Sequence, residues 1–424
     1  MTATRDHRRS DSVARAIFDH VLPRIRGGTI EVTDAWGAAR VVAAARAGEP
    51  ALCARVTVHE PRLYTRLLRE GSVGLGESYA DGWWDTDDLP ALLRLALRGL
   101  TRTHPALDRA HRVLRPVVDP IARLRRGDKH RDAANVRAHY DVGNDLFERV
   151  LDETMMYSCG VFASPADSLA TASIAKLDRI ATMLRLAPGD RVLEIGTGWG
   201  GFAVHAATRY GCQVTTTTIS ERQYAYASRR VHDAGLADRV CVRNDDYRDL
   251  QGTFDKIVAI EMIEAVDWRE YDAYFARLRA LLTDDGVVGL QAIVVPDHSF
   301  DRTKHHTDFI KAAIFPGGSL PSVGALTRSA RRAGLGLAHL DDIGMHYAET
   351  LRWWRANLAD RRAELSTLGF ADRFLRLWDF YFAYCEAGFD ERAVSVAQLA
   401  YASPGWQRDA LRIPTRDRRQ LSMA

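Results

Sequence analysis

The sequence predicts an α/β protein with a doubly wound sheet, preceded by a smaller α+β domain. At 424 residues the chain exceeds the usual size of one hydrophobic core, so we expect two domains. From about residue 170, apolar β-rich runs alternate with amphipathic helical stretches. This rhythm is typical of βαβ units with helices on both faces of a parallel sheet. A glycine-rich turn joins one of these strands to a helix, as in nucleotide-binding folds of this class.

The first hundred residues mix short strands and helices, and we expect residues 1–100 to form the smaller domain. The segments GTIEVTD (28–34) and ALCARVTVHE (51–60) alternate apolar and polar residues, as half-buried strands do. The segment EPRLYTRLLREG has helical spacing and ends at Gly71. In LPALLRLALRGL (89–100) the leucines fall on one side, which favours a helix over the core of this domain rather than one lying on a membrane.

A basic segment follows, and we expect a helical linker over residues 101–132. Residues 102–131 contain many Arg and few acidic residues, and Pro116 and Pro120 interrupt any long helix. Basic helices attract anionic lipid or nucleic acid. A solvated Arg-rich linker is an equally good interpretation.

We expect residues 133–424 to form the main domain, with helical insertions as a lid. An amphipathic helix ends at Pro188 and Gly189, and another covers residues 269–282. The tail from about His339 is expected to be helical, as a lid or as core packing. Ligands of such sheets bind beyond the carboxyl ends of the strands. The strand candidates are RVLEIG (191–196), QVTTTTIS (213–220), RVCVRNDD (239–246), KIVAIEM (256–262) and GVVGLQAIVV (286–295).

The composition, 46% hydrophobic and 27% charged, is that of an ordinary globular protein. No apolar run is long enough to cross a bilayer, and the charged N-terminus lacks the apolar core of a signal peptide. We therefore expect a cytoplasmic protein whose contact with a membrane is peripheral, at the inner face. The five cysteines are scattered without a CxxC pair, which predicts reduced thiols and no metal site.

The turn in RVLEIGTGWGGFAVHAA (191–207) has the features of a ligand-binding loop. Gly196, Gly198 and Gly200 permit positive φ angles and a close approach to a nucleoside. Glu194 precedes the first of them by two residues, which suits a ligand with a cationic amino group, such as S-adenosylmethionine. A dinucleotide fingerprint belongs in a chain-initial domain. A turn without a ligand would be weakened by so many glycines.

Several long motifs then resemble one family. LEIGTGWGG resembles the first motif of class I methyltransferases, and GLGESYADGWWD resembles the extra N-terminal domain of bacterial cyclopropane-fatty-acyl-phospholipid synthases. The resemblance to that synthase family runs from about residue 70 to residue 390. Its other motifs here are HYDVGNDLFERVLDETMMYSCGVF, DYRDL, EMIEAVDWREYDAYF, FIKAAIFPGGSLPS and HYAETLRWW.

The resemblance implies an enzyme that transfers the methyl of S-adenosylmethionine to a cis double bond in a membrane phospholipid. It also implies a homodimer. With a phospholipid substrate, the basic segment and the neighbouring apolar helix predict contact with an anionic membrane surface rather than with nucleic acid. Attack by an alkene leaves a carbocation, which must be shielded from water and must lose a proton. Such chemistry calls for an apolar, aromatic-lined tunnel, groups that stabilise positive charge, and a base.

Candidate cofactor contacts lie at the glycine turn and in the stretches that match the family. Ser220 and Gln223 also form an S-x-x-Q capping box, which would explain both without a ligand. Asp246 is equally suited to a turn. Glu221 is the acid nearest the end of the second strand and a weaker candidate for the ribose. The full set is Tyr157, Ser158, Glu194, Gly196, Thr197, Gly198, Trp199, Gly200, Gly201, Thr218, Ile219, Ser220, Glu221, Gln223, Asp246 and Tyr247.

For catalysis, the resemblance implies a bicarbonate ion as the base. The matching positions are Cys159, Glu264, Gln291, Ile293 and Tyr347, and Cys385 matches a further active-site cysteine. Glu264 follows a buried strand, where a purely structural carboxylate is costly. Core packing would also account for Tyr347, Cys159 and Cys385.

The chain departs from the family pattern at Gln291, where the cyclopropane-forming members usually carry His. Glutamine can hydrogen-bond an anion but cannot take up a proton, so another group could remove the proton. The motifs EMIEAV, LQAIVVP and HYAETLRWW also resemble a subgroup that makes methylene-branched chains, which a separate reductase converts to 10-methyl acids such as tuberculostearic acid. We expect the cyclopropane product first, with the methylene product as the alternative.

Three other functions stay open from sequence alone. Some relatives methylate amines in small alkaloids, although such substrates need neither an N-terminal domain nor a basic linker. A lipid-binding protein that keeps an inactive methyltransferase fold is a second possibility, and a dinucleotide oxidoreductase is a third. Tighter binding of NADH than of S-adenosylhomocysteine (SAH) would establish the last.

Overall fold

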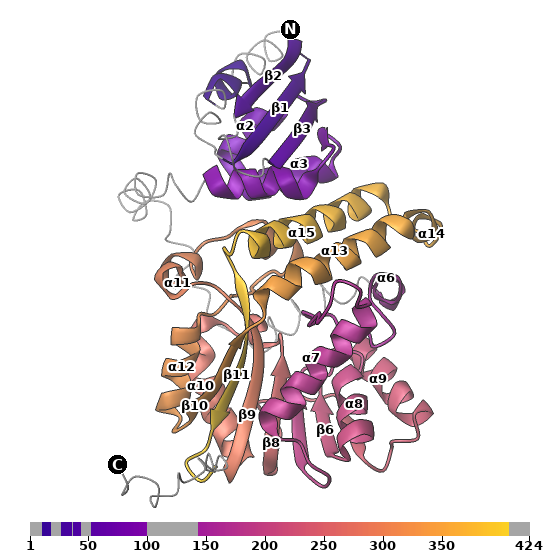
Figure 1. Cartoon of the computed structure of the whole chain (residues 1–424), viewed down its shortest axis with the longest axis vertical. Helices are drawn as coiled ribbons and strands as arrows, with labels where there is room; N and C mark the ends of the chain where they lie inside the picture. Colours follow the sequence, from indigo (N-terminus) through magenta and orange to yellow (C-terminus); the bar gives the residue numbers. More distant parts are fainter. Residues whose placement is uncertain (1–10, 18–26, 36, 44–51, 100–142, 407–424) are drawn as a thin grey trace, which may run out of the picture.

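The computed structural model contains two sheets that lie one above the other along the long axis of the molecule (Figure 1). It describes residues 11–17, 27–35, 37–43, 52–99 and 143–406. The expected linker, residues 101–132, lies outside these ranges, so its boundaries stay a prediction. Among the described residues, no helix combines the length and the hydrophobicity needed to span a bilayer.

The smaller sheet has the strand order β2-β1-β3-β4. Strand β1 pairs parallel with β3 and antiparallel with β2, and β4 pairs antiparallel with β3. Both predicted strands and the helix ending before Gly71 are present. The elements of this part are β1 (Gly28–Asp34), β2 (Gly37–Ala43), β3 (Leu52–Val58), α2 (Arg62–Glu70), α3 (Ser72–Ala80) and β4 (Trp84–Thr86), followed by a helix over residues 89–99.

The larger sheet has seven strands in the order β10-β11-β9-β8-β5-β6-β7. The five strands from β5 to β9 are parallel, as the alternating pattern predicts. Short apolar runs rich in Val and Ile explain why these segments form buried strands. They are β5 (Arg191–Ile195), β6 (Gln213–Thr217), β7 (Val240–Arg243), β8 (Phe254–Ile260) and β9 (Leu282–Val294).

The tail departs from the helical expectation, because two strands complete this sheet. Strand β10 (Gly336–Asp342) begins before the expected tail and contains His339, and β11 (Ser395–Ala402) ends the described chain. β11 lies between β9 and β10 and is antiparallel to both, so the sheet is mixed. The Ala-rich sequence SVAQLAYA resembles a helix in its propensities, whereas burial of both faces of β11 selects the strand.

Helices cover both faces of the larger sheet, which is the doubly wound arrangement. Leu177, Phe202 and Val231, from α7, α8 and α9, pack on one face, and Phe275 and Leu326, from α10 and α12, pack on the other. The bounds of these helices are α7 (Leu169–Leu184), α8 (Gly201–Tyr210), α9 (Glu221–Asp233), α10 (Tyr271–Leu281) and α12 (Val323–Arg332).

Between the two sheets lies a layer of long helices, of which α13 and α15 are the most prominent (Figure 1). Their aromatic side chains form most of a third core with α6 and with α3 above it. The remaining elements are α6 (Asn144–Val150), η3 (Ile263–Ala265), η4 (Trp268–Glu270), α11 (Asp297–Thr303), η5 (Ile310–Ile314), α13 (Gly344–Asp360), α14 (Arg362–Thr367) and α15 (Asp372–Asp390).

The smaller sheet is joined to this layer by close packing and by buried polar contacts. A Cβ on Gly76 of α3 would lie 2.4 Å from the ring of Phe309, so glycine permits the contact. The Tyr79 hydroxyl donates to Asp379 of α15 at 2.9 Å. Arg94 and Arg98 each donate to Glu391 at 2.7 Å. The two parts therefore form a continuous packed structure.

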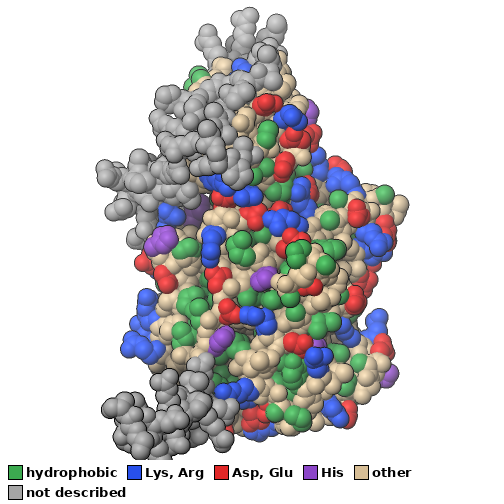
Figure 2. All heavy atoms as spheres, in the orientation of Figure 1, with side chains coloured by type: hydrophobic (Ala, Val, Ile, Leu, Met, Phe, Trp, Pro, Cys, Tyr) green, Lys and Arg blue, Asp and Glu red, His purple; other side chains and the backbone are tan. Residues whose placement is uncertain are grey.

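Charges on the described surface are largely paired. Figure 2 shows acidic and basic side chains interspersed over the described part of one face. Many of the arginines form ion pairs, such as Arg376 with Asp85 at 2.8 Å and Arg352 with Asp390 at 2.8 Å. The described part of that face therefore presents no broad region of a single charge.

Candidate active site

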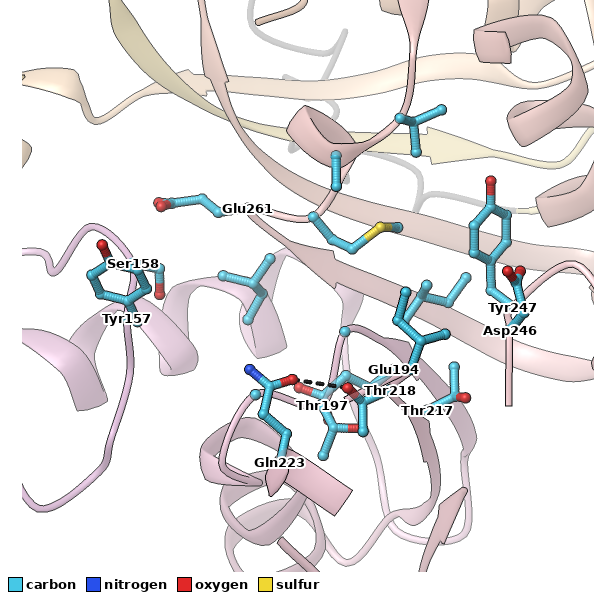
Figure 3. Close-up of a pocket in the computed structure, with 18 of the residues that line it drawn as sticks. Tyr157, Ser158, Glu194, Thr197, Thr217, Thr218, Gln223, Asp246, Tyr247 and Glu261 are labelled. Atoms are coloured by element: carbon cyan, nitrogen blue, oxygen red, sulfur yellow. Dashed lines mark hydrogen bonds between the residues drawn. The ribbon is translucent and has the colours of Figure 1, made fainter. Parts of the chain in front are cut away.

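A pocket opens at the carboxyl ends of β5, β6 and β8, where doubly wound sheets bind their ligands. Figure 3 shows Asp246 and Tyr247 at one end of it and Tyr157, Ser158 and Glu261 at the other. Its walls come from several short stretches of the chain. They are Met155–Ser158, Glu194–Trp199, Thr217–Ile219 with Gln223, Asp245–Arg248, Ile260–Met262, and Ala265–Asp267 with Glu270.

The glycine turn leaves room for a ligand. Gly198 has φ +52°, and a Cβ placed on it would meet nothing within 4 Å, so this position faces open space. By contrast, a Cβ on Gly201 would lie 2.5 Å from the Met156 sulfur. Gly200 and Gly201 do not line the pocket; Gly201 instead lets the segment around Met156 approach the start of α8.

Glu194, on β5, brings a carboxylate to the pocket wall. Its side chain is buried and accepts a hydrogen bond from the Thr216 hydroxyl at 2.6 Å. Burial raises the pKa of this carboxyl to about 8. A bound cation would favour the ionised form, so the site is suited to a ligand with an ammonium group.

The neighbouring part of the wall carries polar groups from the segments that follow β6 and β7. The Thr218 hydroxyl donates to the Gln223 side chain at 2.8 Å (Figure 3). Asp246 accepts from the Arg248 guanidinium at 2.7 Å, and Tyr247 lines the pocket beside it. These residues lie where the sequence places contacts to a nucleoside.

Three of the predicted cofactor contacts lie at the beginning of α9, and only one of them, Gln223, lines the pocket. Ser220 caps this helix by accepting from the Gln223 backbone N–H at 3.3 Å, as half of the predicted capping box. The Gln223 side chain turns instead toward Thr218 and the pocket. Glu221 is exposed and, like Ser220, does not line the pocket, because its position in the first turn of α9 directs it outward. Contact of Glu221 with the ribose therefore stays a prediction from sequence.

A buried lysine supports the loop that closes the pocket. Lys176 of α7 is fully buried and donates to the Ser158 hydroxyl at 2.5 Å. Burial lowers the pKa of Lys176 to about 8, against the attraction of nearby carboxylates that include Glu261 and Glu194. The ammonium thus lies among the carboxylates of the pocket and fixes Ser158 in place.

Glu261, the first residue after β8, accepts hydrogen bonds from three residues that are distant from it in the sequence. Its Oε1 accepts from the Cys159 backbone N–H at 2.9 Å and from the Gln291 Nε2 at 2.8 Å. Its Oε2 accepts from the Tyr347 hydroxyl at 2.7 Å. Its backbone has φ +50°, a left-handed conformation that is uncommon for a residue with a side chain.

The orientation of the Gln291 amide is set by a neighbouring strand. Gln398 of β11 pairs with Gln291 of β9 in the sheet register. Its Nε2 donates to the Gln291 Oε1 at 3.0 Å, which leaves the Gln291 Nε2 directed at Glu261. β11, which was not expected from sequence, therefore completes this hydrogen-bond network.

Glu264 lies behind the pocket wall rather than on it. It does not line the pocket, and its Oε1 accepts from the Ile293 backbone N–H at 2.6 Å. Its buried Oε2 has no hydrogen-bond partner among the described residues. Burial, and secondarily the charge of Glu261, raises the pKa of Glu264 to about 8. Of the two glutamates in EMIEAV, Glu261 rather than Glu264 faces the pocket.

The other proposed catalytic residues separate into two groups. Cys159 and Tyr347 contact Glu261 as described above, although the Cys159 thiol is buried and its pKa is raised by that burial. Cys385, on α15, packs in the aromatic layer and does not line the pocket. Burial raises the pKa of its thiol, so a thiolate is disfavoured there. The structure thus brings Cys385 into core packing.

At the end of the pocket that carries Glu261, Tyr157 lines the wall and further aromatic rings pack behind it. The Tyr157 ring lies 5.0 Å from the rings of Phe147 and Trp354, and its hydroxyl hydrogen-bonds the Tyr381 hydroxyl at 2.8 Å. The Tyr347 ring stacks on Phe389 at 4.5 Å. Ring faces attract positive charge, so this end suits a cationic transition state.

Sequence reasoning missed Glu261, Lys176 and Gln398. Glu261 had a usable signal, because it is the first residue after a predicted strand and hence at the ligand-binding edge. Lys176 interrupts the apolar face of its predicted helix, which is itself unusual. Gln398 lies in a strand that the pattern does not indicate.

The family model for mycolic acid cyclopropane synthetase matches residues 127–399. The chain is 40% identical over 359 residues to the tuberculostearic acid methyltransferase of Mycobacterium tuberculosis, covering 82% of this chain and 83% of that protein. It is 36% identical over 352 residues to the cyclopropane-fatty-acyl-phospholipid synthase of Escherichia coli, covering 82% and 88% respectively.

Solved structures show the same architecture. The crystal structure of a mycolic acid cyclopropane synthase complexed with SAH and CTAB has a TM-score of 0.60 and 30% sequence identity. It covers 64% of this chain and 98% of its own. The larger sheet and its helices are therefore of the class I methyltransferase type.

Proposed function

Because this chain belongs to the mycolic acid cyclopropane synthetase family, we propose that it methylates the cis double bond of an unsaturated phospholipid acyl chain. It is an S-adenosylmethionine-dependent methyltransferase that acts on lipids. The observation that carries the finer proposal is the division of the pocket. A buried carboxylate and an open glycine turn lie on one side, and aromatic rings with a second carboxylate lie on the other.

The pocket fits the methyl donor. S-adenosylmethionine supplies an electrophilic methyl group on a sulfonium. We assign its amino group to Glu194, its backbone contacts to the turn around Gly198, and its adenosine to the end with Asp246 and Tyr247. This direction leaves Tyr157 and Glu261 at the end where an acyl chain would react.

The chain's own residues then protect the reaction. The ring of Tyr157 is held between Phe147 and Trp354, so its π face is fixed beside the pocket. Lys176 holds Ser158, which keeps the segment Met155–Ser158 over the donor site. Glu264 bonds the Ile293 backbone and so fixes the end of β9. Together these contacts exclude water and preorganise the charge around a developing cation.

We infer the methylene-branched acyl chain as the product. The similarity to a tuberculostearic acid methyltransferase, at 40% identity, supports this outcome, as does glutamine at position 291. A hydride shift from the methyl-bearing carbon to the neighbouring cationic carbon then precedes loss of a methyl proton. A separate reductase would be needed to obtain the saturated methyl branch. The second candidate is the cyclopropane product, which the 36% identity to the Escherichia coli synthase favours.

The test is transfer of label from methyl-labelled S-adenosylmethionine to vesicles of an oleoyl phospholipid by the full-length protein. The two products have equal mass, so catalytic hydrogenation followed by fragmentation separates them. We expect label in lipid and a methylene that takes up hydrogen. Gly198→Leu, which fills the open side of the glycine turn, is the matched control and should lose both SAH binding and turnover. Label only in soluble amines would refute the lipid substrate.

A further inference from the structure

We propose that Glu261 is the catalytic base of this enzyme and takes the place of the bicarbonate ion that the family resemblance implies. This inference rests on the proposed methyl transfer to an alkene. It concerns which group accepts the proton that the resulting carbocation loses. Four features of the described residues carry it: occupied hydrogen-bond donors, local charge, an open lone pair and a strained backbone.

The donors that an exogenous anion would use are already engaged. The Cys159 N–H, the Gln291 amide and the Tyr347 hydroxyl all donate to the Glu261 carboxylate, at 2.7–2.9 Å. The fourth matching group, the Ile293 N–H, donates to Glu264 at 2.6 Å. Of the five positions assigned to bicarbonate, the four that donate therefore serve protein carboxylates and the fifth, Glu264, is one of those carboxylates, so the residues do not fit an additional anion.

The charge at this position also disfavours a second anion. Glu261 itself supplies a negative charge here, whereas Glu264 and Glu194, whose pKa values are raised to about 8, are mainly protonated near neutral pH. The ammonium of Lys176 is directed to Ser158 rather than toward an open anion site. Like charges at short range in a buried site repel strongly. The geometry is thus that of a site which already contains its anion.

The Glu261 carboxylate has room for the proton. A carboxylate has about four lone-pair positions. Oε1 accepts two hydrogen bonds and Oε2 accepts one from the described residues, so Oε2 keeps an acceptor position. Glu261 itself lines the pocket beside Met262. Burial also raises the pKa of this carboxyl, which makes its anion a stronger base.

The backbone at Glu261 is held in a conformation that a side chain disfavours. Its φ of +50° lies in the left-handed region, where glycine is the favoured residue. Such strain persists where surrounding contacts enforce it, and it concentrates at functional sites. The Glu261 N–H donates to the Gln291 carbonyl at 2.7 Å, which anchors this backbone to β9.

Loss of a proton to Glu261 follows transfer of the methyl group. Methyl transfer breaks the C–S bond of the donor and forms a C–C bond to one alkene carbon, leaving a cation on the lipid. Glu261 Oε2 then removes a proton from the transferred methyl carbon. The electron pair of that C–H bond forms the second bond of a methylene after a hydride shift, or the third side of a ring without one. Glu261 ends as a carboxylic acid and returns its proton to solvent when the product leaves.

The experiment uses the full-length enzyme in buffer freed of carbon dioxide. We expect the wild-type rate to change less than twofold when bicarbonate is added. Glu261→Gln should lower turnover at least 100-fold while SAH affinity stays within about threefold. Glu261→Gly suits the positive φ and opens a space among the same donors. Its turnover should rise at least tenfold with bicarbonate or formate.

A binding measurement accompanies these rates. In calorimetric titrations of bicarbonate into SAH-bound protein, we expect binding to Glu261→Gly and none to the wild type. Glu386→Gln is the matched control, because Glu386 is also a buried carboxylate with a raised pKa but does not line the pocket. Its turnover should stay within twofold of the wild type.

The inference is overturned if the wild type requires bicarbonate, or if Glu261→Gln keeps more than half of the wild-type rate. These outcomes differ from failure of the proposed function, in which the wild type transfers no label to lipid. In that case the calorimetric comparison still tests whether Glu261 fills the anion position. Binding of bicarbonate to the wild type would overturn the inference whatever the substrate.

Discussion

Glu261 and Glu264 show how neighbouring residues of one type acquire different chemistry. Glu261 is held by three donors and lines the pocket, whereas Glu264 has one bonded oxygen and one buried oxygen without a partner among the described residues. Burial raises the pKa of Glu264 to about 8, which keeps it mainly protonated near neutral pH. A neutral Glu264 next to an ionised Glu261 avoids two adjacent negative charges.

At the same scale, Glu194 predicts a pH dependence for binding of the donor or of SAH. Its pKa of about 8 in the ligand-free pocket means that the carboxyl holds a proton below that pH. Pairing with an ammonium group requires the carboxylate, so binding releases a proton. Affinity for SAH should therefore rise about tenfold per pH unit up to about pH 8 and then level off. Calorimetry at several pH values measures this slope.

Glu194→Gln provides the comparison for that measurement. Glutamine has a similar shape but does not titrate, so its affinity for SAH should be lower at pH 8 and nearly independent of pH. An equal slope in the variant would assign the pH dependence to another group.

The sequence indicates which residues belong to the site better than it indicates the role of each one. The sequence marks the glycine turn, Glu194 and the stretch Tyr157–Cys159, since each belongs to a long motif. It does not distinguish Glu261 from Glu264, because the difference arises from contacts with Tyr347 and Gln291, which are distant in the chain. Tertiary contacts, rather than composition, decide which glutamate faces the pocket.

Among the secondary-structure elements, β11 contributes to the candidate site as well as to the sheet. Its Gln398 fixes the Gln291 amide, which in turn donates to Glu261. A side chain that does not touch the ligand thus determines how the carboxylate on the pocket wall is held. Gln398 is a positioning residue in this arrangement.

We expect Gln398→Leu to lower kcat about tenfold with little change in SAH affinity. Without its partner, the Gln291 amide can turn its oxygen toward Glu261, and the buried Gln291 oxygen is left unpaired at a cost of about 1–3 kcal/mol in folding free energy. Steady-state rates and thermal unfolding measure the two effects. Gln251→Leu, at an exposed glutamine, is the control.

A double variant separates positioning from general destabilisation. If Gln398 acts through Glu261, adding Gln398→Leu to Glu261→Gln should cost little further activity. Independent, multiplicative losses would show that Gln398 acts by another route.

The parallel strands were predictable because their apolar runs rich in Val and Ile stand out in the sequence. The antiparallel pair was not, for physical reasons that differ between its strands. β10 is an edge strand with mostly exposed or half-buried residues, so it lacks a hydrophobic pattern. β11 is Ala-rich and buried on both faces, so neither alternation nor β-branching marks it. Only the space left between β9 and β10 determines its conformation.

At the scale of the whole molecule, the described part of the face in Figure 2 shows mixed charges, whereas the sequence concentrates Arg in residues 102–131. That segment lies outside the described residues. Peripheral binding to an anionic membrane through it stays a prediction from sequence. The aromatic layer of α13 and α15 joins the donor pocket to the smaller sheet.

We expect association with anionic phospholipid vesicles to weaken severalfold as ionic strength rises from about 0.05 to 0.5 M. Replacing Arg123, Arg125 and Arg126 with Gln should weaken the association by about 100-fold, since each charge contributes about 1 kcal/mol. Vesicle co-sedimentation measures both. Exchanging Arg361, Arg362 and Arg392, which pair with acids in the described structure, is the control and should change little. Association that is insensitive to salt would exclude this mode.

The late position of β11 has a consequence for the biogenesis of the enzyme. During translation, the donor pocket of β5, β6 and β8 emerges from the ribosome long before Gln398 does. A nascent or prematurely terminated chain would therefore enclose the donor without a correctly oriented base. Because β11 is the last described strand, the contact that orients the Gln291 amide forms only after nearly all of the described chain has been synthesised.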